Sequence, residues 1–255
     1  MSFGLNAYSL RNHMQTEEDF LTLALALKGA GYSYLQFSGS PLGAESIRRV
    51  SEKSGLPVVL THMPMERILH DTDALMEEHA RYNCKNIGLG MMPVETILDE
   101  HKCKETILML DERAAYLKEH GYKFFYHHHH FEFYRMGRET VLDFMLKNAP
   151  HIHITADTYW LQYGGGDILR CLERMKGRIE CVHLKDYKIA NRDGKLVPEF
   201  APLGEGVLDF PAIIDKMKVL GVQYFLVEQD NAAQHENGIE EVIRSANYLK
   251  EKIGL

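Results

Sequence analysis

The sequence predicts a (β/α)8 barrel that occupies residues 1–255 as a single domain. Eight short apolar segments, rich in β-branched and aromatic residues, alternate along the chain with amphipathic segments of helical period. The apolar segments are largely continuous, as strands are when both faces of a parallel sheet are buried. No Pro-, Gly- or Ser-rich linker divides the chain, and its length is ordinary for one closed barrel.

The expected elements follow one another in strict alternation. Strands are expected at Phe3–Leu10, Tyr32–Ser38, Pro57–His62, Asn86–Met91, Lys123–His129, Ile152–Asp157, Ile179–Lys185 and Tyr224–Glu228. Helices are expected at Glu17–Gly29, Ala44–Ser54, Arg67–Tyr82, Glu95–His120, Glu139–Asn148, Asp167–Lys176, Phe210–Val219 and Ile239–Ile253. Gly31, Gly55, Gly121 and Gly221 each stand just before a strand, where the end of a helix calls for a positive φ.

A doubly wound open sheet is the alternative architecture. That fold places a Gly-rich phosphate-binding turn after an early strand. The segment at Ser38–Gly43 (SGSPLG) matches the GxGxxG pattern poorly. The eight alternations therefore favour the closed barrel.

Charge and composition exclude several classes of protein. The formal net charge is −7 and no long basic run exists, which disfavours a nucleic-acid partner. No apolar run is long enough to span a membrane, and the first residues show no export signal. The four cysteines lack CxxC spacing and are expected to be buried thiols. We therefore expect a cytoplasmic protein, and the sequence leaves homo-oligomer formation open.

Polar residues end the last four expected strands. In a (β/α)8 barrel such residues point into the active-site mouth. A buried, unpaired carboxylate is strongly destabilised by desolvation, so acids at the ends of apolar strands need a partner. We predict that Glu132, Asp157, His183 and Glu228 converge on one divalent ion, Mn²⁺, Co²⁺, Zn²⁺, Fe²⁺ or Mg²⁺. A salt bridge at the barrel rim is the alternative for each residue taken alone.

Several motifs carry a resemblance to a known family. They are Tyr126–Phe133 (YHHHHFEF), similar to the family's YHNHxxEF, Asp157–Trp160 (DTYW) followed by Gly165–Asp167 (GGD), His183–Asp186 (HLKD), and Leu203–Phe210 (LGEGVLDF). Through their order and spacing, the chain resembles the xylose isomerase-like sugar phosphate isomerases and epimerases over essentially its whole length. The resemblance implies a (β/α)8 barrel, the metal site above and a small carbohydrate-like substrate. It also implies that His62 faces the pocket.

The sequence departs from the ketose 3-epimerases of that family at three positions. Those enzymes carry a Glu at the very end of strand five, which is both ligand and base, whereas this chain has histidines there. Trp160 replaces a His of strand six, and Ile189 replaces an Arg that follows strand seven. The metal site therefore carries over better than the epimerase chemistry, and His129 becomes a candidate ligand in place of the missing Glu.

Four consecutive histidines, His127 to His130, lie at the end of the fifth expected strand. Because side chains alternate along a strand, His127 and His129 share one face and His128 and His130 share the other. At most one of these pairs faces the pocket.

Further residues are expected to contact the substrate: Tyr8, His62, His127, Trp160 and Lys185. Trp160 offers an apolar wall for a sugar ring, and Lys185 a cation for a hydroxyl or enolate oxygen. The alternatives are core packing for Tyr8 and Trp160, and an ion pair with Asp186 for Lys185.

The predicted chemistry is metal-assisted proton transfer next to a carbonyl. Glu228 and Glu132, or a histidine of strand five, would act as opposed base and acid. The same enediolate serves epimerisation, isomerisation and dehydration of the inosose type, and the residues do not choose among the three. Two alternatives stay open: a DNA-repair enzyme resembling endonuclease IV, and a non-catalytic sugar-binding barrel.

Overall fold

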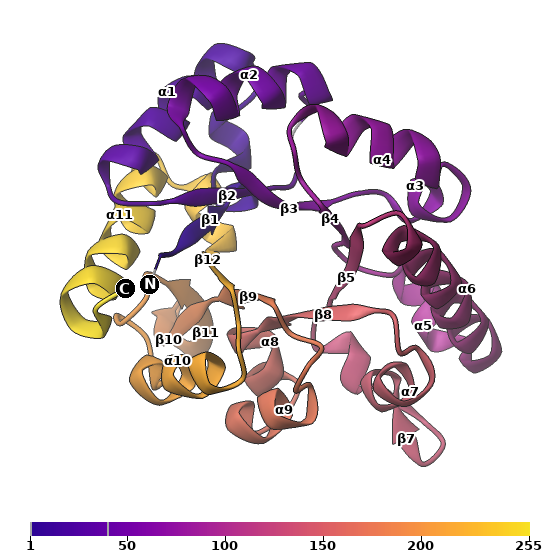
Figure 1. Cartoon of the computed structure of the whole chain (residues 1–255). Coiled ribbons are helices and arrows are strands. Elements are labelled where there is room, and N and C mark those ends of the chain that lie inside the picture. Colours follow the sequence, from indigo (N-terminus) through magenta and orange to yellow (C-terminus); the bar gives the residue numbers. More distant parts are fainter. Residues whose placement is uncertain (1, 40) are drawn as a thin grey trace.

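Eight parallel strands close into a barrel in the computed structural model, which describes residues 2–39 and 41–255. Figure 1 shows the strands as an inner ring and the helices around it. The strands pair in the order β1-β12-β9-β8-β5-β4-β3-β2. Their bounds are β1 (Gly4–Asn6), β2 (Tyr34–Phe37), β3 (Val58–His62), β4 (Asn86–Leu89), β5 (Lys123–His127), β8 (His153–Asp157), β9 (Cys181–Leu184) and β12 (Tyr224–Val227). The predicted (β/α)8 barrel is confirmed; Ser40, within the Ser38–Gly43 segment, lies outside the described residues.

All eight strands are shorter than predicted, and the differences at the first and fifth strands bear on the site. The segment at Phe3–Leu10 is a strand only as far as Asn6, and a 3-10 helix, η1 (Ala7–His13), follows it. The Asn6 side chain accepts a hydrogen bond from the Tyr8 N–H and so turns the chain into this helix. Strand β5 ends at His127, two residues before the predicted end.

Eleven α-helices cover the outside of the barrel among the residues that the structure describes. They are α1 (Glu17–Gly29), α2 (Ala44–Ser54), α3 (Met65–His70), α4 (Thr72–Arg81), α5 (Val94–Leu98), α6 (Glu100–Glu119), α7 (Val141–Asn148), α8 (Thr158–Tyr163), α9 (Ile168–Arg174), α10 (Phe210–Val219) and α11 (Gly238–Tyr248). A π-helical turn, η4 (Leu249–Ile253), follows α11. Gly31, Gly55, Gly121 and Gly221 all have positive φ, as predicted from their places at helix ends.

Two of the predicted helices are each broken into two. The segment at Arg67–Tyr82 divides at Asp71, which separates α3 from α4. The segment at Glu95–His120 divides at Asp99, whose extended backbone and side-chain hydrogen bond from the Lys102 N–H begin α6. An acidic N-cap within a helical pattern therefore marked a new helix rather than a continuing one.

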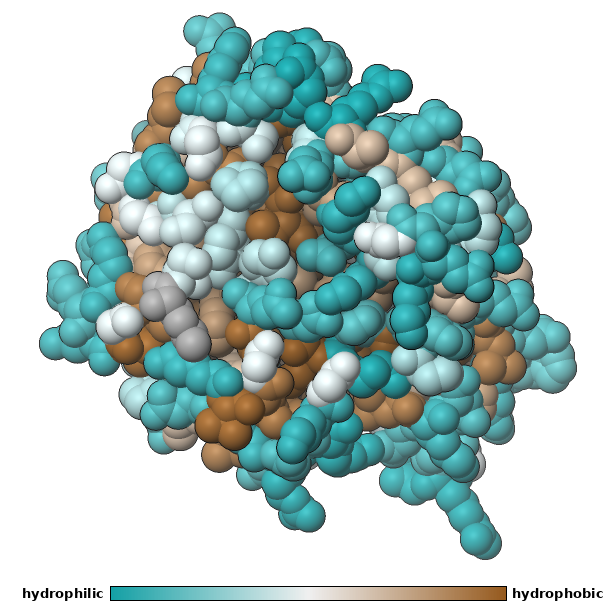
Figure 2. All heavy atoms as spheres, viewed as in Figure 1, coloured by the Kyte–Doolittle hydropathy of each residue, from teal (hydrophilic) through white to brown (hydrophobic). Residues whose placement is uncertain are grey.

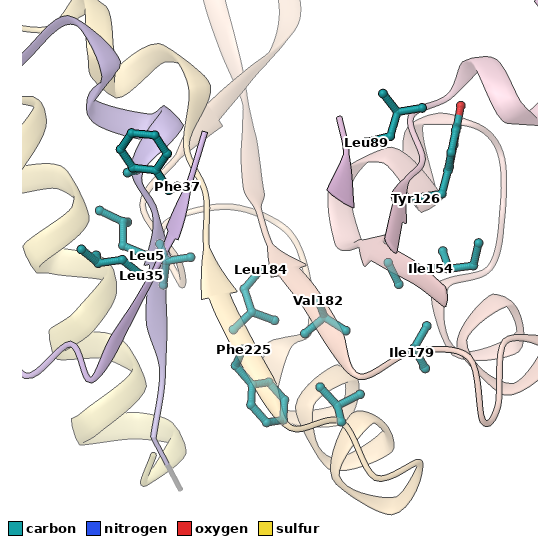
Figure 3. Close-up of a cluster of buried hydrophobic side chains, with 14 of the residues drawn as sticks. Leu5, Leu35, Phe37, Leu89, Tyr126, Ile154, Ile179, Val182, Leu184 and Phe225 are labelled. Atoms are coloured by element: carbon teal, nitrogen blue, oxygen red, sulfur yellow. The ribbon is translucent and has the colours of Figure 1, made fainter. Parts of the chain in front are cut away.

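The hydrophobic core lies between the strands and the helices. Figure 3 shows members of this layer, among them Leu5 and Leu35 on β1 and β2, and Phe225, Val182 and Leu184 on β12 and β9, the next strands on the other side of β1. Leu5 and Leu35 are paired in register across β1 and β2. These alternate residues of each strand face outward, which leaves the residues between them to fill the barrel interior.

Two hairpins extend the barrel beyond the predicted elements. The longer one joins β10 (Asp186–Arg192) to β11 (Lys195–Ala201) through Asp193 and Gly194, both with positive φ. Asp-Gly between two strands is typical of a two-residue hairpin turn, but this hairpin was not among the elements predicted from the sequence. The shorter one pairs β6 (Arg135–Met136) with β7 (Glu139–Thr140), so the helix predicted from Glu139 begins instead at Val141.

The outer surface is largely polar on the face that Figure 2 shows. Hydrophilic side chains (teal) cover most of it, and hydrophobic ones (brown) form smaller patches between them. Among residues 2–39 and 41–255, no helix has the length and apolar character needed to cross a bilayer.

Candidate metal centre

Four buried side chains meet inside the carboxyl end of the barrel: His127 of β5, Asp157 of β8, His183 of β9 and Glu228 directly after β12. The parallel register aligns Asp157 with His183, and the Glu228 N–H continues the ladder by donating to the Leu184 carbonyl at 3.0 Å. Each residue offers one ligand atom, and these four atoms lie within 4.8 Å of one another. The strand ends therefore deliver two imidazoles and two carboxylates to one point.

The tautomer of His183 is fixed by its neighbour on β2. Its Nε2–H donates to the side-chain oxygen of Gln36 at 2.7 Å, because an amide oxygen can only accept. The other ring nitrogen, Nδ1, then faces Glu228 Oε2 at 2.7 Å and Asp157 Oδ2 at 3.8 Å. Neither His183 Nδ1 nor Glu228 Oε2 has a hydrogen-bond partner among the described residues.

His127 repeats this arrangement on the other side of the group. Its Nδ1–H donates to the Gly90 carbonyl at 3.2 Å, and its Nε2 faces Asp157 Oδ2 at 3.4 Å. Burial, and then the nearby His183 and His129, hold the pKa of His127 well below its usual value. The imidazole is therefore neutral, with a lone pair directed at a carboxylate.

This arrangement fits a divalent cation. A ligating histidine usually donates its second N–H to a carbonyl or carboxylate, as His127 and His183 both do. Two lone pairs that face carboxylate oxygens repel them unless a cation lies between. Mixed nitrogen and oxygen ligands suit Mn²⁺, Fe²⁺, Co²⁺ or Zn²⁺.

A buried ammonium stands beside the group. Lys185 Nζ lies 3.3 Å from Asp157 Oδ2, 3.2 Å from Glu228 Oε2 and 3.2 Å from Asp230 Oδ2. Burial acts to lower the pKa of Lys185, but the three carboxylates outweigh it and raise the pKa above its usual value. Lys185 is therefore charged.

The two carboxylates of the group differ in their electrostatics. Burial raises the pKa of Asp157 to about 6, although Lys185 acts in the opposite direction. For Glu228 burial also acts to raise the pKa, but Lys185 and His183 outweigh it and hold the pKa below its usual range. Asn6 adds a hydrogen bond from Nδ2 to Glu228 Oε1 at 2.9 Å. Glu228 is thus the more firmly ionised of the two.

The alternative partner considered for Lys185 is engaged elsewhere. Asp186 accepts hydrogen bonds from the backbone N–H groups of Tyr187, Gly204, Gly206 and Leu208. Asp186 therefore ties the loop after β11 to the end of β9, and no ion pair between Lys185 and Asp186 occurs.

Glu132, predicted as a ligand and as a catalytic residue, lies outside the four-residue group. Its Oε1 accepts from the Tyr126 hydroxyl at 2.6 Å, and its Oε2 accepts from the His129 N–H at 2.7 Å. Tyr126 is on the helix-facing side of β5, so Glu132 sits behind the strand in the short 3-10 helix η2 (Phe131–Phe133). Glu132 is therefore a buried residue whose hydrogen bonds hold the loop after β5, and His127 stands in the four-residue group where Glu132 was predicted.

The four histidines divide between cavity and strand support. The rings of His127 and His129 lie 4.5 Å apart and both border the cavity, as the alternation predicts for one pair. His129 is nonetheless outside the four-residue group, because the strand ends at His127. His128 instead accepts a hydrogen bond from the Asp157 N–H at 3.1 Å, which links β5 to β8.

A cavity of about 350 Å³ opens beside the group. Its lining includes Tyr8, His62, His127 and Lys185 of the predicted substrate contacts, and also His129, Glu228 and Asp230. Trp160 is not part of this lining, but its ring lies 5.0 Å from that of His129 and 5.3 Å from Lys185 Nζ. The structure therefore gathers the predicted contacts around one cavity, with Trp160 in the wall behind it.

Three residues of the site were not predicted: Asn6, Gln36 and Asp230. Asn6 and Gln36 hold Glu228 and His183, and Asp230 pairs with Lys185. Asn6 and Gln36 are polar residues near the ends of the first two apolar strands. The strand-end argument applied to those strands would have found them.

The chain resembles known proteins in sequence as well as in fold. A family model described as "Xylose isomerase-like TIM barrel" matches residues 25–252. An inosose dehydratase of Clostridium perfringens is 28% identical over 171 residues, which cover 62% of this chain and 58% of that protein. The chain thus spans less than two thirds of the length of the curated relatives it matches.

Solved structures share the fold. A sugar phosphate isomerase/epimerase from Parabacteroides distasonis superposes with a TM-score of 0.82 at 21% identity, covering 98% of this chain and 94% of that one. A probable 3-DHS dehydratase from Bacillus anthracis superposes with a TM-score of 0.71 at 13% identity, covering 99% and 100%. At these identities the likeness concerns the fold alone.

Proposed function

The chain belongs to the xylose isomerase-like TIM barrel family, and from that premise we propose that it is a metal-dependent enzyme acting on a keto-sugar or keto-polyol. The proposed reaction begins with removal of the proton next to the carbonyl. One observation carries the proposal: two buried histidines each donate one N–H to a protein carbonyl oxygen and turn the other nitrogen toward a buried carboxylate. The partner proposed is a small carbohydrate-like molecule, with no nucleic acid.

The ligands proposed for the ion are His127, Asp157, His183 and Glu228. A divalent ion held by these residues would polarise the ketone carbonyl and stabilise the enolate next to it. Gln36 and the Gly90 carbonyl keep the two imidazoles in the tautomers that bind a cation.

Proton transfer is assigned to Glu228 and support of the substrate to Lys185. Glu228 is an ionised carboxylate that borders the cavity, and Asn6 holds its Oε1 in place. Lys185 presents a charged ammonium to the same cavity and can donate a hydrogen bond to a substrate oxygen that gains negative charge. Glu132 has no part in this step, because it lies behind β5.

Dehydration is the outcome that the curated relatives favour. In that outcome the carbon that loses its proton to Glu228 forms a double bond to its neighbour, and the C–O bond of the neighbour breaks as Glu228 returns the proton to the leaving hydroxyl, so that one water molecule is released. This chemistry needs a base on one face of the substrate only. Glu228 supplies that base, and the strand-five Glu of the ketose 3-epimerases is replaced by imidazoles.

Isomerisation or epimerisation is the second candidate. The observation in its favour is His129, which borders the cavity and whose Nδ1 has no hydrogen-bond partner among the described residues. It would supply the second proton-transfer group that epimerisation requires on the opposite face. Water loss separates the outcomes, since a dehydratase product is lighter than its substrate by one water.

The proposal is tested by metal content and turnover together. Elemental analysis of the purified protein should give about one divalent ion per chain, and chelation should abolish turnover of a panel of inososes, ketoses and ketose phosphates until metal is restored. Asp157→Asn should lower the metal content while the barrel stays folded. Glu132→Gln is the matched control, because that buried carboxylate lies outside the group. Full metal in Asp157→Asn, or turnover that survives chelation, would refute the proposal.

A further inference from the structure

The cavity beside the four proposed ligands has an outer bay lined by His129, Lys185 and Asp230, and the rings of Trp160 and Phe200 form the wall behind Lys185. The ring centres of Trp160 and Phe200 lie 5.3 and 5.4 Å from Lys185 Nζ and 6.2 Å from each other. Phe200 comes from the β10–β11 hairpin, and its carbonyl accepts a hydrogen bond from Asn231 at 3.1 Å. That bond attaches the hairpin to η3 (Asp230–Gln234), the segment that carries Asp230.

Three polar atoms of the outer bay are buried without a partner among the described residues. They are Asp230 Oδ1, His129 Nδ1 and Trp160 Nε1. Buried polar atoms in folded proteins nearly always find a hydrogen-bond partner, so the two that belong to the cavity lining, Asp230 Oδ1 and His129 Nδ1, indicate that a ligand supplies it. The carboxylate oxygen accepts, and the imidazole nitrogen donates or accepts according to its tautomer. Hydroxyl groups, which both donate and accept, satisfy such a set.

The charge of the cavity argues against an anionic ligand. Asp157, Glu228 and Asp230 face a single ammonium, that of Lys185. One divalent ion would balance the two remaining negative charges and leave no cation of the lining for a phosphate.

A further cation beside the cavity is Arg11, which contacts two lining residues, Tyr8 and Asp230, but does not itself line the cavity. Its guanidinium stacks on the Tyr8 ring at 4.1 Å and donates to the carbonyls of Tyr8 and Asp230. A phosphate bound by Arg11 would have to share the mouth with the Asp230 carboxylate. Replacing Arg11 therefore tests the opposite outcome, in which the cavity prefers a phosphorylated ligand.

From these observations, and resting on the proposed function, we infer that the outer bay selects an uncharged polyhydroxylated substrate and that Asp230 is the residue that determines this specificity. Asp230 Oδ1 accepts a substrate hydroxyl, while its charge disfavours a phosphate group.

Trp160 supplies the measurement, because it is the only tryptophan of the chain and its ring lies 5.3 Å from Lys185 Nζ, in the wall of the bay. Its fluorescence is titrated in the Mg²⁺- or Zn²⁺-loaded protein with two unreactive probes, myo-inositol and myo-inositol 1-phosphate. The wild type should bind the uncharged probe more tightly, by about tenfold or more. Asp230→Asn should weaken inositol binding by about ten- to a hundredfold, as expected for losing a hydrogen bond to a charged group, and should reduce the preference. Arg11→Gln should leave both affinities within about twofold.

Two results would overturn the inference. One is a wild type that prefers the phosphate and loses that preference in Arg11→Gln; the other is a folded Asp230→Asn that binds inositol as the wild type does. If Asp230→Asn does not fold, the wild-type preference together with Arg11→Gln decides the matter. Failure of the proposed function looks different: the ion and the probes bind, yet no ketone of the panel is turned over.

Discussion

Two adjacent layers of side chains inside the barrel differ in polarity: one is apolar, and the other consists of polar and ionisable groups. The inner layer is apolar and consists of Tyr34, Leu60, Phe125, Cys181 and Leu226, all buried. The mouth layer lies two residues further along the same five strands and consists of Gln36, His62, His127, His183 and Glu228. Side chains of residues i and i+2 share a face of a strand. Two residues along each strand, the side chain inside the barrel therefore changes from one that packs in the core to one that belongs to the site.

The comparison shows how a barrel supports a costly site. Burying charged and polar groups is unfavourable unless partners compensate for lost hydration. The mouth layer contains polar atoms that have no hydrogen-bond partner among the described residues, such as His183 Nδ1 and Glu228 Oε2. The inner layer directly beneath it has ordinary apolar packing and stabilises the strands that hold those groups in register. We therefore expect changes in the mouth layer to affect function and changes in the inner layer to affect stability.

The largest expected effect is at Glu228. Glu228→Gln should lower turnover of the identified substrate by about 10²- to 10⁴-fold, as is typical for loss of a positioned base. A Gln carbonyl can still bind a cation but cannot accept the substrate proton. Metal content is therefore expected to fall only in part. Steady-state kinetics with elemental analysis makes the check, and wild-type turnover in this variant would rule out Glu228 as the base.

The inner layer should respond through stability. Phe125→Ala should lower the free energy of unfolding by about 3–5 kcal/mol, since it leaves a cavity in the fully buried interior. Urea denaturation of the apo protein measures the change, with Phe125→Leu as the milder control. The folded fraction should still bind metal. Little change in stability would contradict the division of roles between the layers.

A smaller effect on metal binding is expected for Gln36, which is not a proposed ligand but accepts a hydrogen bond from one, His183. Gln36→Leu removes the acceptor that fixes the His183 tautomer and should weaken metal binding by about 10- to 100-fold. Chelator competition measures this, and Gln223→Leu at an exposed position is the control. An unchanged affinity in Gln36→Leu would show that the tautomer is set by the ion alone.

The smallest effect separates the mouth histidines from a buried histidine that serves the fold. His79 of α4 donates from Nδ1 to the Leu75 carbonyl and accepts at Nε2 from the Thr61 hydroxyl. Burial lowers the pKa of His79 to about 4, below its value in the unfolded chain. The unfolded state therefore binds more protons as the pH falls through the range between these two values, and the stability that His79 contributes is lost.

This loss is measurable by substitution. The stability advantage of the wild type over His79→Gln should shrink by about 1–2 kcal/mol between pH 7.5 and pH 5. Comparing the two proteins cancels the other buried histidines, which remain in both. Chemical denaturation at the two pH values gives the difference. An advantage that does not depend on pH would mean that His79 titrates normally in the folded protein.

The sequence by itself predicted the barrel, because eight apolar segments alternated with amphipathic ones and four glycines stood at helix ends. It also indicated Asp157, His183 and Glu228. Each of them lies at or next to the carboxyl end of a strand, and the direction of the strand fixes where the side chain points. Those three are the positions of the candidate site that the structure brings together from the strand-end argument.

Only the tertiary structure decided the rest of the site. Within β5 the alternation of side chains placed His127 toward the cavity, but the strand ends there, and beyond it no period relates sequence to direction. The η2 turn carries Glu132 back behind the strand to Tyr126, where the sequence alone had placed it among the ligands. Asn6, Gln36 and Asp230 join the site through contacts with residues more than 40 positions away. A local pattern fixes a direction only while the backbone stays regular, and loops take theirs from what they pack against.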